Sequence, residues 1–308
     1  MNLIITFFRD YIAVINIFFL ITIVLLERKK PVYTLFWITI LILAPYIGFI
    51  FYLFFGLSFR KKRVVDKFYK WKFLHSKKVI SSSERKDLNR WKQLISYLEI
   101  ASNNKLTTLN AFKLFTEGNI FFNNMIKDLE EAKHSINMEY YIFRYDDLGK
   151  RIIDILIEKA KSGVEVNVII DEAGGADRKM IKLMRDNNIN VEIFFPSPFA
   201  FFKIANLRAN YRDHRKLCLI DSKLGYIGGF NIGLEYLSKG KLGHWRDTGV
   251  RVFGEAVLEL EKEFFFSWGI AKKKPVVYQP KEYAFEHEAF QEIIKVKGKY
   301  SGYSQVVS

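Results

Sequence analysis

The sequence is poor in cysteine and carries no familiar cofactor signature, and each shortage narrows the possible classes of protein. Cys218 is the only cysteine among 308 residues, so the chain cannot close an intramolecular disulfide. Because Cys218 lies in an apolar run, we expect it to behave as a small buried hydrophobic residue. The sequence has no P-loop, no dinucleotide-binding fingerprint and no Cys/His metal-ligand spacing. We therefore predict no cofactor and no metal.

Acidic residues are also scarce relative to basic ones. The 33 Asp and Glu residues face 48 Lys and Arg residues, which gives a formal net charge of +15. Half of the residues are nevertheless hydrophobic, and 16% are aromatic. This combination is typical of a membrane protein with a basic face beside the bilayer, although a nucleic-acid-binding protein would also be basic.

Two long apolar runs, 3–26 and 32–55, stand at the start of the sequence. As helices, each run is long enough to cross a hydrocarbon core of roughly 30 Å. A short charged turn at 27–31 separates them, so residues 1–57 are predicted to form a transmembrane helical hairpin. A cleaved signal peptide is the alternative for the first run, but no small-residue cleavage site precedes Glu27.

Basic residues are concentrated after the second apolar run. Arg60–Arg63 begin a segment, 58–116, which we interpret as a basic juxtamembrane and helical linker. The excess of cations there, compared with the short turn at 27–31, predicts a multi-pass membrane protein with both termini, and therefore the chain after the hairpin, in the cytoplasm. The basic stretch suits anionic lipid, and a solvated linker is the competing interpretation.

Residues 117–276 alternate between helical and extended patterns. We expect helices at 117–132, 148–161, 178–187 and 255–268, and strands at 135–143, 164–170, 191–195, 217–220, 224–227 and 247–253. This alternation predicts an α/β lobe with a mostly parallel or mixed sheet and helices on both faces.

One segment, 211–231, combines several groups suited to phosphoryl chemistry. His214 and Lys216 are two residues apart on an extended stretch, so their side chains point to the same side. A histidine can attack phosphorus, and a nearby lysine can neutralise the charge that builds on the phosphoryl oxygens. Asp221 ends the following apolar run. The pair Gly228–Gly229 then allows close approach of the backbone to a ligand, and Asn231 offers an amide donor.

This spacing resembles the signature of the phospholipase D superfamily, H-x-K-x4-D-x6-G-G-x-N. The apolar N-terminal pair, the strand NMEYYIF and the segment HWRDT at 244–248 are similar, in the same order, to bacterial cardiolipin synthases. The resemblance implies an enzyme that joins two phosphatidylglycerol molecules into cardiolipin and releases glycerol. It further implies a phosphohistidine intermediate, no metal, and a phospholipid and a membrane as partners, with no nucleic acid expected.

The resemblance also assigns roles within the catalytic set His214, Lys216 and Asp221. His214 would be the nucleophile or the general acid, and Lys216, Gly229 and Asn231 would hold the phosphoryl oxygens. Asp221 would organise the turn after its strand without touching substrate.

Two further acidic residues, Asp247 and Glu139, are candidates for a place near this set. Asp247 would orient the histidine, with an ion pair to Arg246 or Arg251 as the competing role. Glu139 is expected to be an ordinary polar strand residue.

The family carries two copies of the motif, whereas this sequence holds one. The segment 75–82 begins like a second copy of the motif, with a histidine and a lysine two residues apart, but Ser82 stands in place of the aspartate. Residues 277–308 resemble a linker and the first strand of an absent second lobe, which indicates a truncation before that lobe and an unpaired strand edge. The missing half-site is expected from a homodimer or a complementing chain. An inactive cardiolipin synthase fragment and a membrane-tethered phosphodiesterase or nuclease are the alternatives.

Overall fold

The computed structural model describes residues 11, 18, 31–44, 47–48, 51–52, 86–194, 213–240, 243–281 and 302–307. The chain divides into two compact units. The first contains residues 1–65 with 204–208, and the second contains residues 66–203 with 209–308.

In the first unit, helix α2 covers Pro31–Leu43. Its side chains are mainly apolar, and Leu35, Ile42 and Leu43 are exposed, whereas Leu41 is buried. No helix within the described residues combines the length and the apolar character needed to cross a membrane. Most of the predicted span 3–26, and the parts of 32–55 beyond residues 32–44, 47–48 and 51–52, lie outside the described residues.

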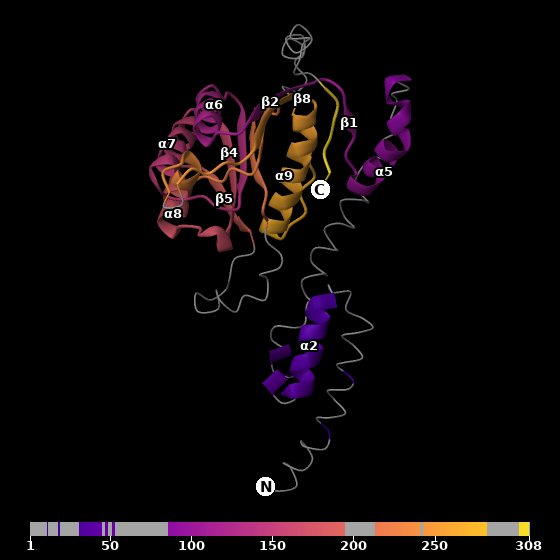
Figure 1. The fold of residues 1–308 in the computed structure, drawn as a ribbon. Coiled ribbons are helices and arrows are strands. Elements are labelled where there is room, and N and C mark those ends of the chain that lie inside the picture. Colours follow the sequence, from indigo (N-terminus) through magenta and orange to yellow (C-terminus); the bar gives the residue numbers. More distant parts are fainter. Residues whose placement is uncertain are drawn as a thin grey trace. The chain divides into compact units, whose positions relative to one another are not determined.

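The second unit is an α/β structure, drawn in Figure 1. Its α-helices are α5 (Lys92–Ser102), α6 (Gly118–Glu130), α7 (Asp147–Lys161), α8 (Arg178–Asp186) and α9 (Ala256–Lys272). Its strands are β1 (Leu106–Thr107), β2 (Asn110–Phe115), β3 (Ser135–Tyr140), β4 (Glu165–Asp171), β5 (Asn190–Phe194), β6 (Lys216–Ile220), β7 (Leu224–Gly228), β8 (Gly249–Gly254) and β9 (Ser304–Gln305). Short 3₁₀ helices occupy Lys86–Trp91 (η2), Glu172–Gly174 (η3) and Leu234–Leu237 (η5).

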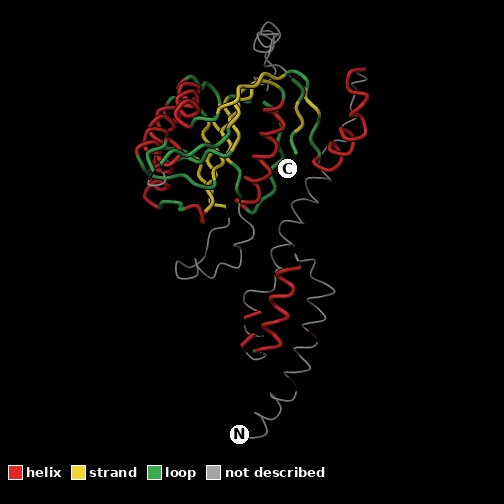
Figure 2. The backbone as a smooth tube through the Cα atoms, viewed as in Figure 1, coloured by secondary structure: helices red, strands yellow, loops and turns green. Residues whose placement is uncertain are grey.

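Seven of these strands form one sheet in the order β2-β8-β7-β6-β3-β4-β5 (Figure 2). The pairs β3–β4 and β4–β5 are parallel, because helices α7 and α8 return the chain to the same end of the sheet. The pairs β3–β6, β6–β7, β7–β8 and β2–β8 are antiparallel. The sheet is therefore mixed, and its parallel part is confined to the three strands that helices connect.

Helices cover both faces of this sheet, as predicted. On one face Met125 of α6, Ile152 of α7 and Met180 of α8 pack with side chains of β3, β4, β6 and β7 in a single buried cluster. On the other face Val257 and Phe264 of α9 pack with Leu217, Leu219 and Val252 in a second cluster. Figure 1 shows α9 on the opposite side of the strands from α6, α7 and α8. Cys218 is fully buried in the first cluster, which confirms the expectation for it.

Two expectations about the ends of this unit are wrong. The helical part of the linker interpreted at 58–116 is present as α5, but the helix does not continue to 116, because β1 and β2 follow and β2 pairs along its whole length with β8. The described part of the last segment, 302–307, does not leave an unpaired strand, because β9 pairs antiparallel with β1. Asn110 and Thr107, both buried, bond the backbone of Gly302 and Ser304.

Candidate functional site

The central strand β6 presents the two basic residues of the motif at its beginning. His214 precedes the strand and its side chain is exposed, while Lys216 is the first strand residue and is half-buried. The Lys216 ammonium donates a hydrogen bond to the backbone carbonyl of His214. His214 and Lys216 therefore meet at the start of β6 through the backbone carbonyl of His214.

Tyr141, directly after β3, is a site residue that the sequence reasoning missed. Its ring stacks on the imidazole of His214, with ring centroids 3.9 Å apart and planes inclined by 24°. The Lys216 ammonium also lies 5.5 Å from the centre of this ring, within the range of a cation–π interaction. Gly174 of η3 allows this placement, because a Cβ there would stand 1.6 Å from the Tyr141 carbonyl oxygen. The only sequence signal was a tyrosine at the end of the strand next to the motif.

The electrostatic surroundings of Lys216 act in opposite directions. Burial lowers the pKa of its ammonium below the usual value of 10.5, and the charges of Asp247 and Asp213 oppose this shift without cancelling it. Lys216 therefore lies close enough to both carboxylates to be influenced by them, and its proton is held less tightly than that of a solvated lysine.

The acidic residue of the HWRDT segment, Asp247, packs against the second glycine of the motif pair, Gly229. A Cβ at Gly229 would stand 1.8 Å from Asp247 Oδ1, so the carboxylate occupies the space where a side chain would otherwise be. Gly229 N donates to the Thr248 carbonyl over 2.9 Å. Gly228 has φ of +156° and faces Gly249 across the β7–β8 ladder. Gly229 is thus required for the close approach of Asp247.

One of the two ion pairs considered for Asp247, that with Arg251, is not formed. Arg251 pairs instead with Asp128, with Nε–Oδ2 at 2.7 Å and Nη2–Oδ1 at 3.0 Å. Asp247 Oδ1 accepts a hydrogen bond from the backbone N of Thr248 at 2.7 Å. Among the described residues, no hydrogen bond joins Asp247 to His214, so its orienting role stays a prediction.

Asn231 is almost fully buried and connects two segments. Its Oδ1 accepts a hydrogen bond from the backbone N of Ile142 at 3.1 Å, and its Nδ2 donates to the Tyr236 hydroxyl. Backbone bonds between 142–144 and Ile232 continue this connection. One N–H of the amide remains for a ligand, which is compatible with the predicted phosphate contact.

Asp221 lies at the far end of β6 from His214. Its carboxylate accepts three backbone hydrogen bonds, from Lys133 N at 2.9 Å, His134 N at 2.7 Å and Ser135 N at 2.9 Å. Asp221 and Ser222 both have φ of 53°, as in the tight hairpin turns that favour Asp and Asn. In this position Asp221 stabilises the turn after β6 and the backbone that leads into β3. It lies at the opposite end of β6 from the exposed imidazole of His214.

We expect an Asp221→Ala variant to lose about 2 to 3 kcal/mol of unfolding free energy, because three amides lose a charged acceptor. Thermal melting of the purified chain in detergent should then fall by roughly 5 to 10 °C. Asp221→Asn keeps a side chain that tolerates positive φ and one acceptor oxygen, so its loss should be smaller. Equal melting temperatures for the Ala variant and the unmodified chain would contradict this role.

A buried polar cluster lies under the motif, on the α9 side of the sheet. Glu139 of β3 is 1% exposed, and the Arg215 guanidinium lies 3.5 Å from its Oε1. Burial raises the pKa of the Glu139 carboxyl well above its usual value, more than the charge of Arg215 lowers it. Glu139 is therefore no ordinary polar strand residue, and that expectation was wrong. Its burial depends on α9, which is more than a hundred residues away in sequence.

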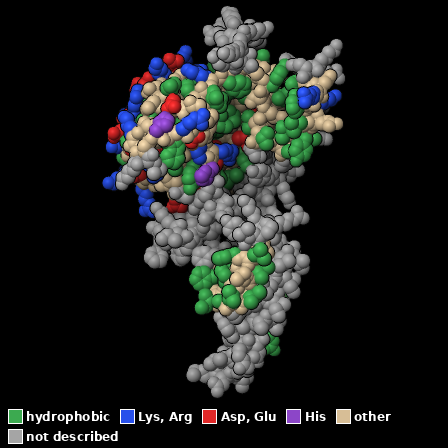
Figure 3. Space-filling view, viewed as in Figure 1, with side chains coloured by type: hydrophobic (Ala, Val, Ile, Leu, Met, Phe, Trp, Pro, Cys, Tyr) green, Lys and Arg blue, Asp and Glu red, His purple; other side chains and the backbone are tan. Residues whose placement is uncertain are grey.

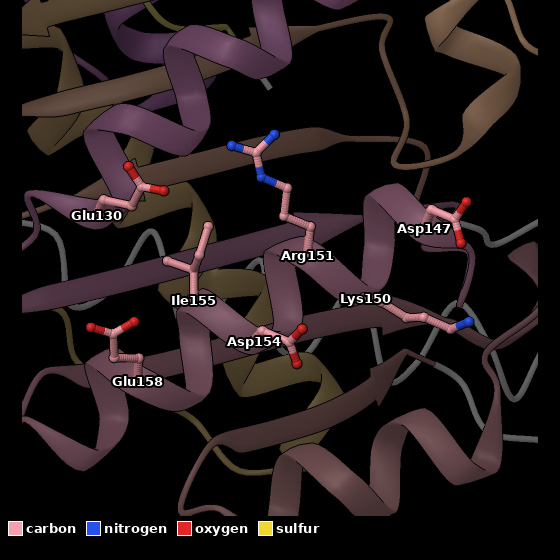
Figure 4. Close-up of a pocket in the computed structure, with 7 residues that line it drawn as sticks. All are labelled: Glu130, Asp147, Lys150, Arg151, Asp154, Ile155 and Glu158. Carbon is pink, nitrogen blue, oxygen red and sulfur yellow. The ribbon is translucent and has the colours of Figure 1, made fainter.

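A hollow in the described part of the α/β unit lies away from the motif. A groove of about 420 Å³ runs along α7 beside Glu130, and no motif residue lines it. In Figure 4 its side chains spread along the helix and do not converge on a common point. Basic and acidic side chains are mixed over the visible face of the α/β unit (Figure 3). No group of His, Cys, Asp and Glu within the described residues could hold a metal ion.

The comparisons with known proteins agree with this geometry. The family model described as the phospholipase D-like domain of cardiolipin synthase matches residues 125–265, and a phospholipase D-nuclease N-terminal model matches residues 14–56. The cardiolipin synthase of Oceanobacillus iheyensis is 38% identical over 285 residues, covering 88% of this chain and 58% of the relative. That of Clostridium perfringens is 39% identical over 265 residues, covering 84% and 55%.

Among solved structures, the phosphatidylserine synthase of Haemophilus influenzae is similar with a TM-score of 0.44 and 18% identity. The match covers 71% of this chain and 51% of that one.

The motif and the matched family model define residues 125–265 as a phospholipase D-like domain. Within that class it is the domain of the cardiolipin synthases. The chain spans a little over half the length of the curated relatives it matches.

Proposed function

We propose that this chain supplies one half-site of a phosphatidyltransferase that joins two phosphatidylglycerol molecules into cardiolipin and releases glycerol. The observation that carries the proposal is that the exposed imidazole of His214 and the Lys216 ammonium both lie against the Tyr141 ring at one end of β6. The names of the curated relatives support the same reaction.

In this reaction an imidazole nitrogen of His214 attacks phosphorus of the first phosphatidylglycerol. The bond from phosphorus to the glycerol headgroup breaks, and the leaving oxygen takes a proton from an acid. A hydroxyl of the second phosphatidylglycerol then attacks the phosphohistidine, its proton passes to the group that acted as the acid in the first step, and the P–N bond breaks to free the imidazole. Lys216 and Asn231 stabilise the charge on the phosphoryl oxygens during both steps.

The acid in the first step calls for a second half-site. We infer that a second copy of this chain, or another chain with its own H-x-K-x4-D motif, supplies it, since the sequence contains one copy. A two-fold arrangement would bring two His214 side chains to one shared site, one as nucleophile and the other as acid.

We further propose that residues 1–57 anchor the protein in the bacterial membrane as a hairpin, with the α/β lobe in the cytoplasm. The length of the two apolar runs, 3–26 and 32–55, supports this assignment. The exposed apolar side chains of Leu35, Ile42 and Leu43 on α2 also suit a lipid environment.

The test is a transfer assay with the purified chain in nanodiscs containing phosphatidylglycerol, which follows cardiolipin and free glycerol together. The proposal expects both products in equal amounts, either from the chain alone or after addition of a chain that carries the second motif. Glycerol release without cardiolipin would identify a hydrolase, and the absence of both products under either condition would refute the proposal.

The pH dependence of this reaction should report on Lys216. Because burial lowers the pKa of its ammonium, the cation that stabilises the phosphoryl oxygens is present at low pH and is lost as pH rises. The rate should therefore fall on the alkaline side through a pKa below 10.5. In a Lys216→Arg variant the guanidinium stays charged, so whatever activity remains should lack this alkaline fall. An unchanged alkaline limb in that variant would assign the titration to another group.

A further inference from the structure

The segment 213–216 directs its side chains alternately to two sides of the sheet. His214 and Lys216 lie on the side of Tyr141, and Asp213 and Arg215 turn toward Glu139 and α9. This alternation follows from the geometry of extended backbone. The residues on either side of the nucleophile in sequence therefore reach into the protein interior.

Hydrogen bonds between Asp213 and Arg215 form a turn that contains the backbone of His214, the residue between them. Asp213 Oδ1 accepts from the backbone N of Arg215 at 3.0 Å and from its Nε at 3.1 Å, and Oδ2 accepts from Nη2 at 3.2 Å. Such a turn fixes the backbone of the residue between donor and acceptor. The backbone N of Asp213 in turn donates to Asp171 Oδ2, at the end of β4, over 3.1 Å.

The Arg215 guanidinium also contacts residues of two other elements, α9 and β3. Arg215 Nη2 donates to the hydroxyl of Ser267 on α9, and Arg215 Nε lies 3.5 Å from Glu139 Oε1 on β3. Asp213 is 7% exposed and Glu139 is 1% exposed. Although burial acts to raise the pKa of the Asp213 carboxyl, its interaction with Glu139 and the charge of Arg215 lower it. Asp213 is thus a carboxylate paired with a half-buried cation.

On the opposite side, the imidazole rests on the Tyr141 ring, and the backbone of that residue is confined by Gly174. Two sets of contacts therefore constrain His214: the turn formed by Asp213 and Arg215 constrains its backbone, and stacking on Tyr141 constrains its imidazole ring. An exposed histidine without such constraints would sample several rotamers.

We propose that Asp213 and Arg215 are positioning residues that hold the His214 imidazole against Tyr141. The proposal rests on the proposed function only in taking His214 as the nucleophile. A reactive nitrogen must lie within about 3 to 3.5 Å of phosphorus and in line with the leaving group, so loss of orientation lowers the rate.

The test compares NMR spectra of the full chain in nanodiscs with its histidine rings labelled. A His214→Ala variant assigns the signal, and Tyr141→Leu gives its position without the ring current of the tyrosine. Asp213→Ala and Arg215→Lys should move the His214 signal toward that position. Arg215→Lys keeps the charge but loses the planar fork, and it covers the case in which the Ala variant does not fold.

Asp128→Asn is the matched control, because Asp128 forms a bidentate pair with Arg251 away from His214. It should lower the melting temperature and leave the His214 signal in place. A His214 signal that stays unchanged in both Asp213→Ala and Arg215→Lys would overturn the proposal. So would an equal displacement in Asp128→Asn, which would reveal a general loss of stability.

In the transfer assay, Asp213→Ala should lower kcat by about 100-fold with little change in KM. The NMR comparison needs no turnover. An unmodified chain that shows the stacked His214 signal and its loss in the variants, yet makes no cardiolipin either alone or with a chain that carries the second motif, would refute the proposed function and retain the positioning role.

Discussion

Replacing His214 by alanine is expected to abolish cardiolipin formation, with a loss on the order of 10⁴-fold or more. The imidazole is the group that attacks phosphorus in the proposed mechanism, and within the motif segment 211–231 it is the only histidine. The sharper measurement is the intermediate itself. Brief incubation with phosphatidylglycerol labelled with ³²P should leave acid-labile, alkali-stable label on the unmodified chain and none on the His214→Ala chain.

His134 provides the matched control. Its side chain is exposed on the turn that leads into β3, so His134→Ala should retain both labelling and transfer. If two chains share one site, mixing His214→Ala with unmodified chain should lower the rate by more than simple dilution. Label that persists on the His214→Ala chain would assign the nucleophile to another residue.

Replacing Gly229 by alanine should have the second largest effect. The new Cβ would fall 1.8 Å from Asp247 Oδ1, far inside van der Waals contact, so the carboxylate and its loop must move. We expect a loss of about 1 to 3 kcal/mol in unfolding free energy from the overpacking. Since Asp247 also influences the charge state of Lys216, the transfer rate should fall by roughly 100-fold.

A double variant separates the two consequences. Removing the carboxylate in Gly229→Ala/Asp247→Ala relieves the clash, so the melting temperature should recover while the transfer rate stays low. Such recovery is a coupling between neighbouring residues, which a double-mutant cycle measures directly. Additive losses in the double variant would show that the alanine acts through some contact other than Asp247.

The sequence predicted those parts of the lobe that depend on local pattern. The helices at 118–130, 147–161 and 178–186 and the strands between them follow from periodicity and from stop signals such as Gly163. The motif positions were also readable, because their spacing within one strand and one turn is a local property. Residues 106–115 were misread as helical because two short strands carry too little pattern to reveal pairing partners elsewhere in the chain.

The buried half of the site could not be predicted from sequence. Nothing near Glu139 in the sequence shows that it meets Arg215, because that contact joins β3 to the segment before β6. The bond from Arg215 to Ser267 likewise spans 52 residues. Tyr141 shows the same limit, since its stacking on His214 depends on the register of β3 against β6. Such contacts depend on tertiary packing and leave no periodic trace.

The pairing of β9 with β1 has a consequence for the order in which the protein is made. The hydrogen bond from Thr107 to Ser304 joins residues 197 positions apart, whereas β3, β4 and β5 are joined through helices that follow one another in the chain. As the polypeptide leaves the ribosome, the three parallel strands can assemble early, but β1 must wait for residues 302–307 to emerge. Edge pairing therefore follows the assembly of the parallel strands, and β1 is exposed to other proteins until it forms.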